Sequence, residues 1–256
     1  MAPMRDPNSI LITGASSGIG EALALGYARS GVNLAISGRD AGRLDGVAEA
    51  CRAKGAEVQA ATVDVTDRDA MAHWIAGTDG AAPLDLVVAN AGISAGTGGD
   101  GESGEQARRL FEVNLQGVLN TVHPAIEAMR PRGKGQVALM SSVASFLPLP
   151  GSPAYAASKA AVRLYGESLR GALAPDGIEV SVICPGFVKS RMTASNPYPM
   201  PFIMPAAKAA RIIQRGLARN RARIAFPWPT YFISWFLGAL PPAFTDPLLR
   251  HLPKKP

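Results

Sequence analysis

The sequence contains very few of the residues that build disulfide frameworks or metal sites. There are two cysteines, Cys51 and Cys184, and three histidines spread over 256 residues. Two cysteines do not make the disulfide scaffold of a small secreted domain, and scattered histidines do not make a metal cluster. We therefore expect the cysteines to be ordinary small apolar residues, and we expect no bound metal ion.

Long apolar segments are also missing. The N-terminus, MAPMRDPNSILITG, has no apolar stretch of signal-peptide length, so we expect a cytoplasmic protein. The apolar run near the C-terminus, Tyr231 to Leu240, is about half as long as a bilayer-spanning helix and has prolines on both sides. The sequence therefore does not predict a transmembrane anchor.

Charged residues make up only 18% of the chain, and the excess of positive charge lies at one end. A hydrophobic content of 47% is typical of a globular protein rather than a disordered one. Residues 208–256 hold nine Lys and Arg against one acid, Asp246. This leaves 17 of the 26 basic and 19 of the 20 acidic residues in the rest of the chain. We expect no nucleic-acid partner.

Strand-like and helix-like segments alternate from residue 9 to residue 186. Short apolar segments begin at residues 9, 33, 57, 84, 135 and 178, and segments with helical spacing lie between them. The longest predicted helix is 105–130; after an irregular segment come a helix at 206–220 and a last strand at 222–227. Strands that are apolar on both faces predict a parallel sheet between two layers of helices. With no repeat and no linker, we predict one α/β domain, a Rossmann-like doubly wound parallel sheet.

The first predicted strand runs into the glycine-rich segment TGASSGIG, residues 13–20. Glycines in this pattern allow a sharp turn, a close approach of a pyrophosphate to the backbone, and tight packing of the next helix. The N-terminus of that helix offers N–H groups and the positive end of its dipole to phosphates. We therefore predict a dinucleotide site rather than a merely tight turn. The expected contacts are Gly14, Ser16, Ser17, Gly18, Ile19 and Gly20.

The end of the second predicted strand, AISGRD, bears on which dinucleotide binds. An acidic residue there would hold the ribose 2′-hydroxyl of NAD, whereas a nearby basic residue would accept the 2′-phosphate of NADP. Gly38 takes the expected place of the acid, and Arg39 follows it. NADP(H) is therefore the predicted cofactor, and the nearby Asp40 keeps NAD(H) as the alternative.

Six motifs in chain order resemble those of the short-chain dehydrogenase/reductase family. They are TGASSGIG (13–20), ANAG (89–92), the asparagine of FEVNLQG, the serine pair 141–142, YAASK (155–159) and the PG at 185–186. The resemblance covers residues 9 to about 190 and implies an enzyme that interconverts a carbonyl and a secondary alcohol by hydride transfer. We accordingly predict a catalytic domain at 1–225, with a substrate lid at about 187–207, and an apolar and basic extension at 226–256.

The resemblance implies four catalytic residues. Tyr155 corresponds to the general acid/base and Lys159 to its partner, and the two share a helix face because they are four residues apart. A tyrosine has an ordinary pKa of about 10, and a nearby cation lowers it. Ser142 corresponds to the serine that donates a hydrogen bond to the substrate oxygen. Asn114 corresponds to an asparagine that acts through a water.

The resemblance also implies the remaining cofactor contacts. The adenine contact corresponds to Asp64 and Val65. The turn beside the adenosine ribose corresponds to Asn90, Ala91 and Gly92. On the nicotinamide side the expected contacts are Tyr155, Lys159, Pro185, Gly186 and Val188. Ser190 stands where the family usually has a threonine, a change that keeps the hydroxyl.

We expect an apolar substrate. The predicted lid is rich in proline and methionine, including Met192, Met200 and Met204, and methionine adapts to irregular apolar ligands. A lipid-, steroid- or acyl-like carbonyl fits this composition and would place the enzyme in lipid metabolism. Core packing of an extra helix is the alternative interpretation of these residues.

Two other functions remain as alternatives. A 3-oxoacyl thioester reductase would use an acidic carrier protein, which could bind the helix that holds Arg211, Arg215 and Arg219. A non-catalytic NADPH-binding protein could share the same fold, but the presence of all four catalytic residues argues against it.

The C-terminal tail combines aromatic residues with basic ones. Two of the three tryptophans, Trp228 and Trp235, lie there with Tyr231, Phe232 and Phe236. Three interpretations are open: a subunit contact, a cover over an apolar cleft, and a patch in the membrane interface, where cations would meet anionic lipid. The cations concerned are Arg219, Arg221, Arg223, Arg250, Lys254 and Lys255. The family resemblance implies a homodimer or homotetramer.

Overall fold

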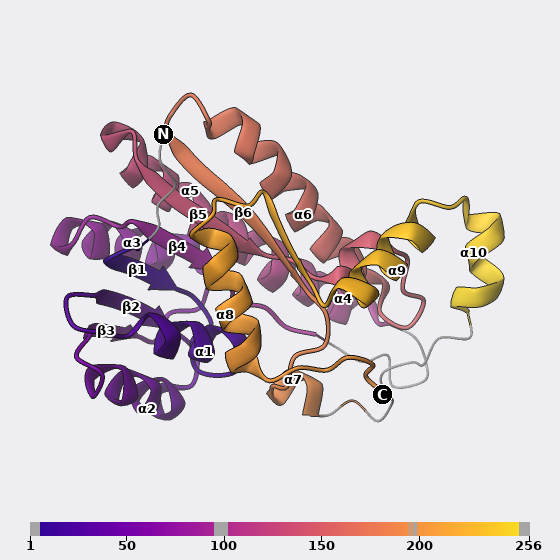
Figure 1. The fold of residues 1–256 in the computed structure, drawn as a ribbon, viewed down its shortest axis with the longest axis horizontal. Coiled ribbons are helices and arrows are strands. Elements are labelled where there is room, and N and C mark those ends of the chain that lie inside the picture. The colour runs from indigo at the N-terminus through magenta and orange to yellow at the C-terminus, as the bar shows by residue number, and fades with distance from the viewer. Residues whose placement is uncertain (1–5, 95–101, 195, 197–198, 251–256) are drawn as a thin grey trace.

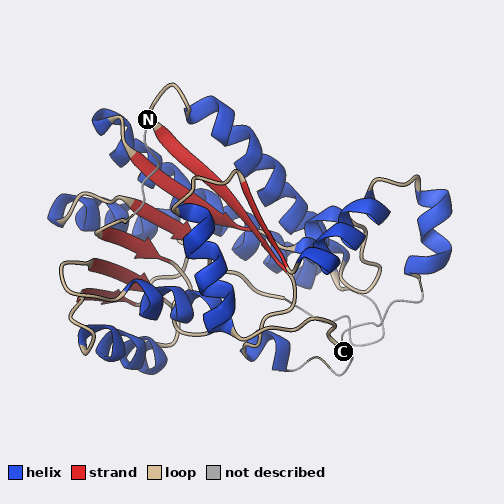
Figure 2. Ribbon diagram, viewed as in Figure 1, coloured by secondary structure: helices blue, strands red, loops and turns tan. Residues whose placement is uncertain are grey.

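The computed structural model describes residues 6–94, 102–194, 196 and 199–250. Within them, one parallel sheet lies between two layers of helices (Figures 1 and 2). The strands are β1 (Ser9–Ile12), β2 (Asn33–Ser37), β3 (Glu57–Ala61), β4 (Leu86–Ala89), β5 (Gly135–Met140), β6 (Ile178–Pro185) and β7 (Arg223–Phe226). The α-helices are α1 (Gly18–Tyr27), α2 (Ala41–Arg52), α3 (Arg68–Ala81), α4 (Gly104–Phe111), α5 (Gly117–Met129), α6 (Pro153–Leu173), α7 (Arg191–Ala194), α8 (Ala206–Leu217), α9 (Trp228–Gly238) and α10 (Pro242–Leu249). Shorter helical turns are η1 (Glu112–Gln116), η2 (Arg130–Arg132) and η3 (Val143–Phe146).

The strand order explains where a site can form. The parallel strands follow the order β3-β2-β1-β4-β5-β6-β7, so the chain starts inside the sheet, builds outward to β3 and then crosses to the far side of β1. The connections that leave the carboxyl ends of β1 and β4 therefore run to opposite faces, and a crevice opens between them. This is the doubly wound, Rossmann-like architecture that the sequence predicts.

Two apolar cores hold the three layers together. Ile10 and Ile12 of β1 pack in the core that includes α1, α2 and α8, whereas Leu11 packs in the core that includes α3, α5 and α6. The division follows from the alternating direction of side chains along a strand. Both cysteines are buried, as expected for small apolar residues.

The predicted helix at 105–130 is interrupted in the structure. A π turn, η1, separates α4 from α5 and holds Asn114. The Asn114 side chain is fully buried and bonds to Ile93 and Ser158. An inserted turn of this kind often marks a functional site, because it aims one side chain away from the regular helical direction.

The predicted third strand, 57–65, is shorter than expected. β3 ends at Ala61. The Asp64 carboxylate accepts hydrogen bonds from the backbone N–H and the hydroxyl of Thr66, both at 2.9 Å. This local turn competes with strand pairing, so Asp64 lies in the connection that follows β3.

The tail packs on the body through α9. This helix follows β7 directly, and β7 confirms the predicted last strand. Gly238 of α9 lies so close to η3 that a Cβ there would clash with the Phe146 carbonyl group. Beyond this contact, α9 and α10 project from one end of the molecule (Figures 1 and 2). No helix in the described parts of the chain is both long and apolar enough to cross a membrane.

Candidate active site

A cleft of about 1120 Å³ runs along the carboxyl ends of the strands. Its walls come from the connections after β1, β2, β3, β4, β5 and β6, together with α6, α9 and α10. Every predicted site residue except Gly20 and Asn114 lines it. Its volume exceeds the roughly 300–1000 Å³ of ordinary ligand pockets, so it has room for a dinucleotide and a second ligand.

The glycine loop fits phosphate groups. Gly14 and Gly18 adopt φ angles of +66° and +64°, in the left-handed region that residues with a side chain rarely adopt. Gly20 lies behind the loop, where a Cβ would clash with the Gly14 carbonyl oxygen. Ser17, the N-cap of α1, makes no side-chain capping bond, and Gly18 and Ile19 at the start of this helix line the cleft. The backbone N–H groups of this first turn are thus suited to bind a pyrophosphate.

The turn after β4 is tied to the end of β1. The Asn90 side chain donates to the carbonyl oxygens of Thr13 at 2.8 Å and Gly14 at 3.1 Å. The Thr13 hydroxyl accepts the backbone N–H groups of Asn90 and Ala91 at 3.0 and 3.1 Å. Thr13 therefore holds two predicted cofactor loops together. Sequence analysis missed this role, and its position directly before Gly14 was the available signal.

Near the end of β2, arginine side chains line the cleft, and the nearby acid, Asp40, is already bonded to Arg43. Gly38 lies against Ser16, whose Oγ would be 3.0 Å from a Cβ at residue 38, so little room is left for a side chain. Arg39 is exposed and lines the cleft. Asp40 instead caps α2, since its carboxylate accepts the Arg43 backbone N–H at 3.0 Å and pairs with the Arg43 guanidinium at 2.6 Å. Arg43, which sequence analysis also missed, lines the cleft as well.

Asp64 lines the cleft together with Arg39. Burial by itself raises the pKa of Asp64, but hydrogen bonds from Thr66 and the charges of Arg109 and Arg39 outweigh it, so the pKa lies below its ordinary value. The Arg109 guanidinium is 3.7 Å from the Asp64 carboxylate. Asp64 is therefore an anion at neutral pH, and Val65 beside it is buried.

Tyr155 and Lys159 share one face of α6, as their spacing predicts. Lys159 Nζ lies 6.0 Å from the centre of the Tyr155 ring and donates to the Met140 carbonyl oxygen at 3.0 Å. Only 4% of Lys159 is exposed, and this burial lowers its pKa to about 8. At neutral pH the lysine is thus still mainly a cation, held beside a half-buried tyrosine that lines the cleft.

β5 ends at two serines that have different surroundings. The Ser141 hydroxyl donates to the Lys159 carbonyl oxygen at 2.8 Å and so joins β5 to α6. The Ser142 hydroxyl accepts the Ala144 N–H at 3.1 Å and is 3.4 Å from the Pro185 carbonyl oxygen. Ser142 lines the cleft, and the one hydrogen bond that its hydroxyl donates is the longer one, to Pro185. The Ser142 hydroxyl is therefore better placed than that of Ser141 to donate to a ligand.

Asn114 supports the cleft from behind. Its amide accepts the Ile93 N–H at 2.8 Å, and donates to the Ile93 carbonyl oxygen at 3.0 Å and to Ser158 Oγ at 3.2 Å. A Cβ at Gly92 would lie 3.0 Å from Asn114 Oδ1 and 3.2 Å from Lys159 Nζ. The asparagine thus joins the turn after β4 to α6 next to the lysine. Its action through a water stays a prediction.

The similarity of this chain to known proteins agrees with this arrangement. A family model for short chain dehydrogenases matches residues 8–199. An uncharacterized oxidoreductase of Myxococcus xanthus is 38% identical over 94% of this chain and 96% of its own. The chain belongs to the short-chain dehydrogenase/reductase family.

Two further relatives are informative. The 11-beta-hydroxysteroid dehydrogenase-like 2 protein of Arabidopsis thaliana is 32% identical over 95% of this chain and 80% of that protein. The structure of a short-chain dehydrogenase from Sphingobium yanoikuyae, in complex with NADPH, is 25% identical and covers 96% of both chains with a TM-score of 0.80.

The part of the cleft outside the predicted cofactor contacts is mainly apolar. The loop after η3 contributes Leu147, Leu149 and Pro150, and the predicted lid contributes Phe187, Met192, Thr193, Asn196, Pro199 and Pro201. The tail contributes Thr230, Ile233, Ser234, Leu237, Leu248 and Leu249. The predicted lid thus borders the cleft, although Met204 packs in the core. The tail forms one wall of the cleft, in line with the interpretation of it as a cover.

A cluster of charged and aromatic side chains fastens α9 to the body. Arg223 pairs with Glu167 at 2.6 Å and donates to the Tyr231 hydroxyl at 3.1 Å. The Phe146 ring lies near the guanidinium groups of Arg163 and Arg223, 4.5 and 5.1 Å from its centre. Arg223 is one of the cations that the membrane interpretation of the tail would bring to anionic lipid; in the structure it is half-buried, and its charge is used to hold α9 in position.

Glu102 completes the N-terminus of the helix that carries Tyr155. Its carboxylate accepts the Ala154 N–H at 2.9 Å, although the two residues are 52 positions apart. An acid at this end of a helix accepts a hydrogen bond from a free backbone N–H group, and its negative charge interacts favourably with the positive end of the helix dipole. Glu102 therefore fixes the first turn of α6, a role that only the tertiary contact reveals.

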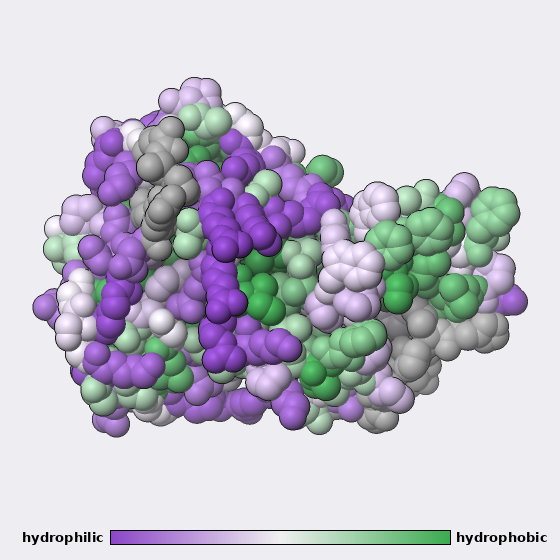
Figure 3. All heavy atoms as spheres, viewed as in Figure 1, coloured by the Kyte–Doolittle hydropathy of each residue, from purple (hydrophilic) through white to green (hydrophobic). Residues whose placement is uncertain are grey.

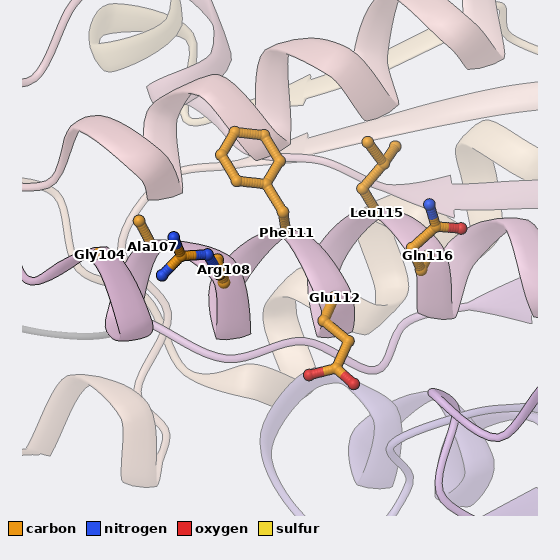
Figure 4. A pocket seen from close by; sticks show the side chains of 7 residues that line it. All are labelled: Gly104, Ala107, Arg108, Phe111, Glu112, Leu115 and Gln116. Carbon is orange, nitrogen blue, oxygen red and sulfur yellow. The ribbon is translucent and has the colours of Figure 1, made fainter.

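A second, shallower hollow of about 540 Å³ lies along α4 and η1 (Figure 4). It is lined by Gly104, Ala107, Arg108, Phe111, Glu112, Leu115 and Gln116, and none of them is a predicted site residue. Phe111 and Leu115 point to one side of these helices and Glu112 to the other. The large cleft, which unites the predicted residues, is therefore the candidate active site.

Proposed function

We propose that the protein is an NADPH-dependent oxidoreductase that interconverts a carbonyl and a secondary alcohol on an apolar substrate. One observation carries the proposal: a single cleft has two arginines at one end, the Tyr155, Lys159 and Ser142 side chains along it, and apolar walls elsewhere. The tyrosine would act as general acid/base. Asn114 would be the fourth member of the catalytic set.

The preference for NADP(H) rests on charge at the end of β2. Arg39 and Arg43 both line the cleft, where they would pair with a 2′-phosphate. Asp40, the residue that would hold an NAD ribose, already caps α2 and pairs with Arg43. Among the similar solved structures, the Sphingobium yanoikuyae protein holds NADPH and a Mycobacterium paratuberculosis protein holds NAD, so the proposed preference rests on the two arginines.

The residues of the chain divide the work of the reaction. When bound, the nicotinamide supplies hydride in the reducing direction and accepts it in the other. Tyr155 gives its hydroxyl proton to the alkoxide oxygen that forms, and takes a proton back in oxidation. The Lys159 cation favours the phenolate after that transfer, and the Ser142 hydroxyl donates a hydrogen bond to the same oxygen.

The lining supports an apolar substrate. The residues that the loop after η3 and the tail contribute carry no charge, and the hydroxyls of Ser152, Thr230 and Ser234 are the polar side chains among them. The names of relatives differ on this point. A gluconate 5-dehydrogenase of Gluconobacter oxydans is 33% identical over 72% of this chain, while the Arabidopsis relative is named for a steroid. An apolar wall favours a lipid-, steroid- or acyl-like carbonyl over a sugar acid.

A 3-oxoacyl thioester reductase is the second candidate, and one observation favours it. Lys208, Arg211 and Arg215 are exposed on α8, and a hydrophilic column follows this helix in Figure 3. Arg219 is also exposed, but it lies in the turn after α8, because the helix ends at Leu217 rather than at the predicted residue 220. The helix begins directly after the lid, so a stripe of cations leads toward the cleft. An acidic carrier protein would complement that charge.

A substrate panel tests the proposal. The protein is incubated with NADPH or NADH and with cyclic ketones, long-chain ketones, steroid ketones, a 3-oxoacyl thioester and a keto sugar acid, and the loss of reduced cofactor is followed by absorbance. We expect faster turnover with NADPH and with apolar ketones. Turnover of the keto sugar acid alone, or a preference for NADH, would overturn the proposal. A strong preference for the thioester attached to its carrier over the free thioester would establish the second candidate.

A further inference from the structure

Exposed apolar side chains gather around the mouth of the cleft. The described residues include eleven large hydrophobic side chains that are exposed, and two of them, Phe111 and Leu164, lie on α4 and α6. The other nine belong to the lid and the tail: Met192, Phe202, Trp228, Phe232, Ile233, Trp235, Phe236, Phe244 and Leu248. We call these nine residues the apolar rim. Such a concentration marks an interaction surface, because monomeric soluble proteins rarely expose large apolar patches.

The helix α9 is apolar on both of its faces. Thr230, Ile233, Ser234 and Leu237 are spaced as one helix face and line the cleft. Trp228, Phe232, Trp235 and Phe236 occupy the other face and do not line the cleft. Their rings contact one another, with Phe232 stacked on Trp228 at 5.3 Å and on Phe236 at 6.2 Å between ring centres. The outer face is therefore an ordered aromatic surface that the fold itself does not bury.

The apolar rim lies on a projection. α9 and α10 extend from one end of the molecule, beyond the three layers (Figures 1 and 2). Apolar colouring covers much of this end in Figure 3, away from the hydrophilic column over α8. Trp228 is 68% exposed and Phe244 is 74% exposed, so the projection carries its most exposed rings at the beginning of α9 and in α10. A narrow apolar projection can enter a lipid interface without bringing the charged body with it.

The charges around the apolar rim are mainly positive. Lys189 and Arg191 of the lid and Arg250 after α10 are exposed, and none of them forms an ion pair with any residue that the structure describes. From residue 187 to residue 250, the one acid in the sequence is Asp246, which is exposed on α10 between the rim residues Phe244 and Leu248. In a two-fold contact between copies, the same patch meets itself, so these cations would face like charges. An anionic lipid surface complements them instead.

We propose that the apolar rim rests in the interfacial region of an anionic membrane, and that an apolar substrate enters the cleft directly from the lipid. The proposal rests on the proposed function for the nature of the substrate. The outer rings of α9 would lie among the acyl chains nearest the headgroups, and Lys189, Arg191 and Arg250 would contact the headgroups. Lys254 and Lys255, which sequence analysis placed with these cations, lie outside the described residues.

Tryptophan fluorescence tests the position of the rim. Two of the three tryptophans, Trp228 and Trp235, belong to the rim, whereas Trp74 is half-buried on α3. The intact protein is mixed with vesicles of phosphatidylcholine and about one third phosphatidylglycerol, with or without bromine on the acyl chains. We expect brominated lipid to quench the wild-type protein. The double variant Trp228→Tyr/Trp235→Tyr, which reports Trp74 alone, should not be quenched.

Vesicle sedimentation with matched variants adds a second measurement. Phe232→Ser/Phe236→Ser removes two outer rings that do not line the cleft, and we expect its vesicle partition coefficient to fall at least tenfold. The control Phe111→Ser/Leu164→Ser removes two exposed apolar side chains elsewhere and should bind like the wild type. High salt should weaken binding, because exposed charges are screened. The α9 helix should not simply be deleted, since its inner face is a wall of the cleft.

The possible outcomes separate membrane binding from the alternatives. Absence of both quenching and sedimentation for the wild type would overturn the proposal. Equal sedimentation of the rim variant and the control would overturn it as well. Loss of a dimer in the rim variant by light scattering, without any lipid binding of the wild type, would make this face an interface between copies. Reduction of a short, water-soluble ketone in buffer without lipid tests the proposed function separately, because it needs no membrane.

Discussion

The Lys159 ammonium group lies 6.0 Å from the centre of the Tyr155 ring, on the same side of α6. The lysine is held there by the Met140 carbonyl oxygen, and α6 is itself joined to β5 through Ser141. A buried cation is therefore fixed next to the predicted proton donor. This arrangement has measurable consequences both for the chemistry and for stability.

Replacement of Tyr155 by phenylalanine should remove carbonyl reduction while leaving cofactor binding nearly unchanged. Only the proton donor is lost, because the ring and its surroundings are kept. We expect kcat for a ketone to fall well over tenfold, measured by cofactor absorbance, and Kd for NADPH to change little, measured by fluorescence titration. Retention of more than about a tenth of wild-type kcat, a barrier change under about 1.4 kcal/mol, would show that another group supplies the proton.

Replacement of Lys159 by methionine should abolish activity but make the cofactor-free protein more stable at neutral pH. Burial lowers the pKa of Lys159 from 10.5 to about 8, so the folded state binds this proton less tightly than the unfolded state. Each tenfold difference in proton affinity corresponds to about 1.4 kcal/mol. Below pH 8 both states are protonated, and the wild type bears the full cost of burying the charge.

The pH dependence supplies the control for the lysine variant. As pH rises from 8 toward 10.5, the folded wild type releases the proton before the unfolded state does, so its stability should rise relative to the methionine variant. We expect the difference in Tm, followed by calorimetry without cofactor, to be largest near pH 7 and to narrow toward pH 10. A variant less stable than the wild type at pH 7 would contradict the argument.

Replacement of Arg39 by alanine should weaken the binding of NADPH much more than the binding of NADH. Hydrogen bonds to a charged group are worth about 1.5–3 kcal/mol, so the ratio of the two Kd values should change by roughly 10- to 100-fold. Arg43→Ala should act in the same direction, and Arg68→Ala, an exposed arginine of α3 outside the cleft, should have no effect. If Arg39→Ala raised the Kd of NADPH and the Kd of NADH by the same factor, Asp40 would be indicated as a ribose ligand instead.

Replacement of Gly238 by alanine should push α9 away from the body. The added Cβ would meet the backbone of Phe146 and Leu147, which cannot move aside as a flexible side chain can. Overpacking of this kind costs about 1–3 kcal/mol, and the cleft wall should shift with the helix. We expect a lower Tm and a higher KM for bulky ketones. Gly171→Ala on α6, where nothing lies within 4 Å, is the matched control and should not be destabilised.

The secondary structure and several site residues could be predicted from the sequence, because they depend on residues that are close together along the chain. Apolar strands that alternate with helices led to the doubly wound sheet, and Gly14 and Gly18 led to the loop whose backbone requires glycine. A spacing of four residues predicted that Tyr155 and Lys159 share a helix face. The family motifs pointed to Ser142 as the catalytic serine; in the structure the Ser141 hydroxyl donates to the Lys159 carbonyl oxygen of α6, and the role of Ser142 stays a prediction.

Other features were decided only when distant segments met. The Asp40 carboxylate caps α2 by accepting the Arg43 backbone N–H. The Glu102 carboxylate accepts the backbone N–H of Ala154 at the start of α6, 52 positions further along the chain. Arg223 forms an ion pair with Glu167 and donates a hydrogen bond to the Tyr231 hydroxyl, and these contacts hold α9 against the body. The sequence by itself determined the order of strands and helices, the glycine loop and the tyrosine–lysine pair, since helical spacing and backbone sterics act locally. The tertiary structure alone decided that the tail is a wall of the cleft with a second, exposed apolar face, because an apolar helix does not specify which of its sides will be buried.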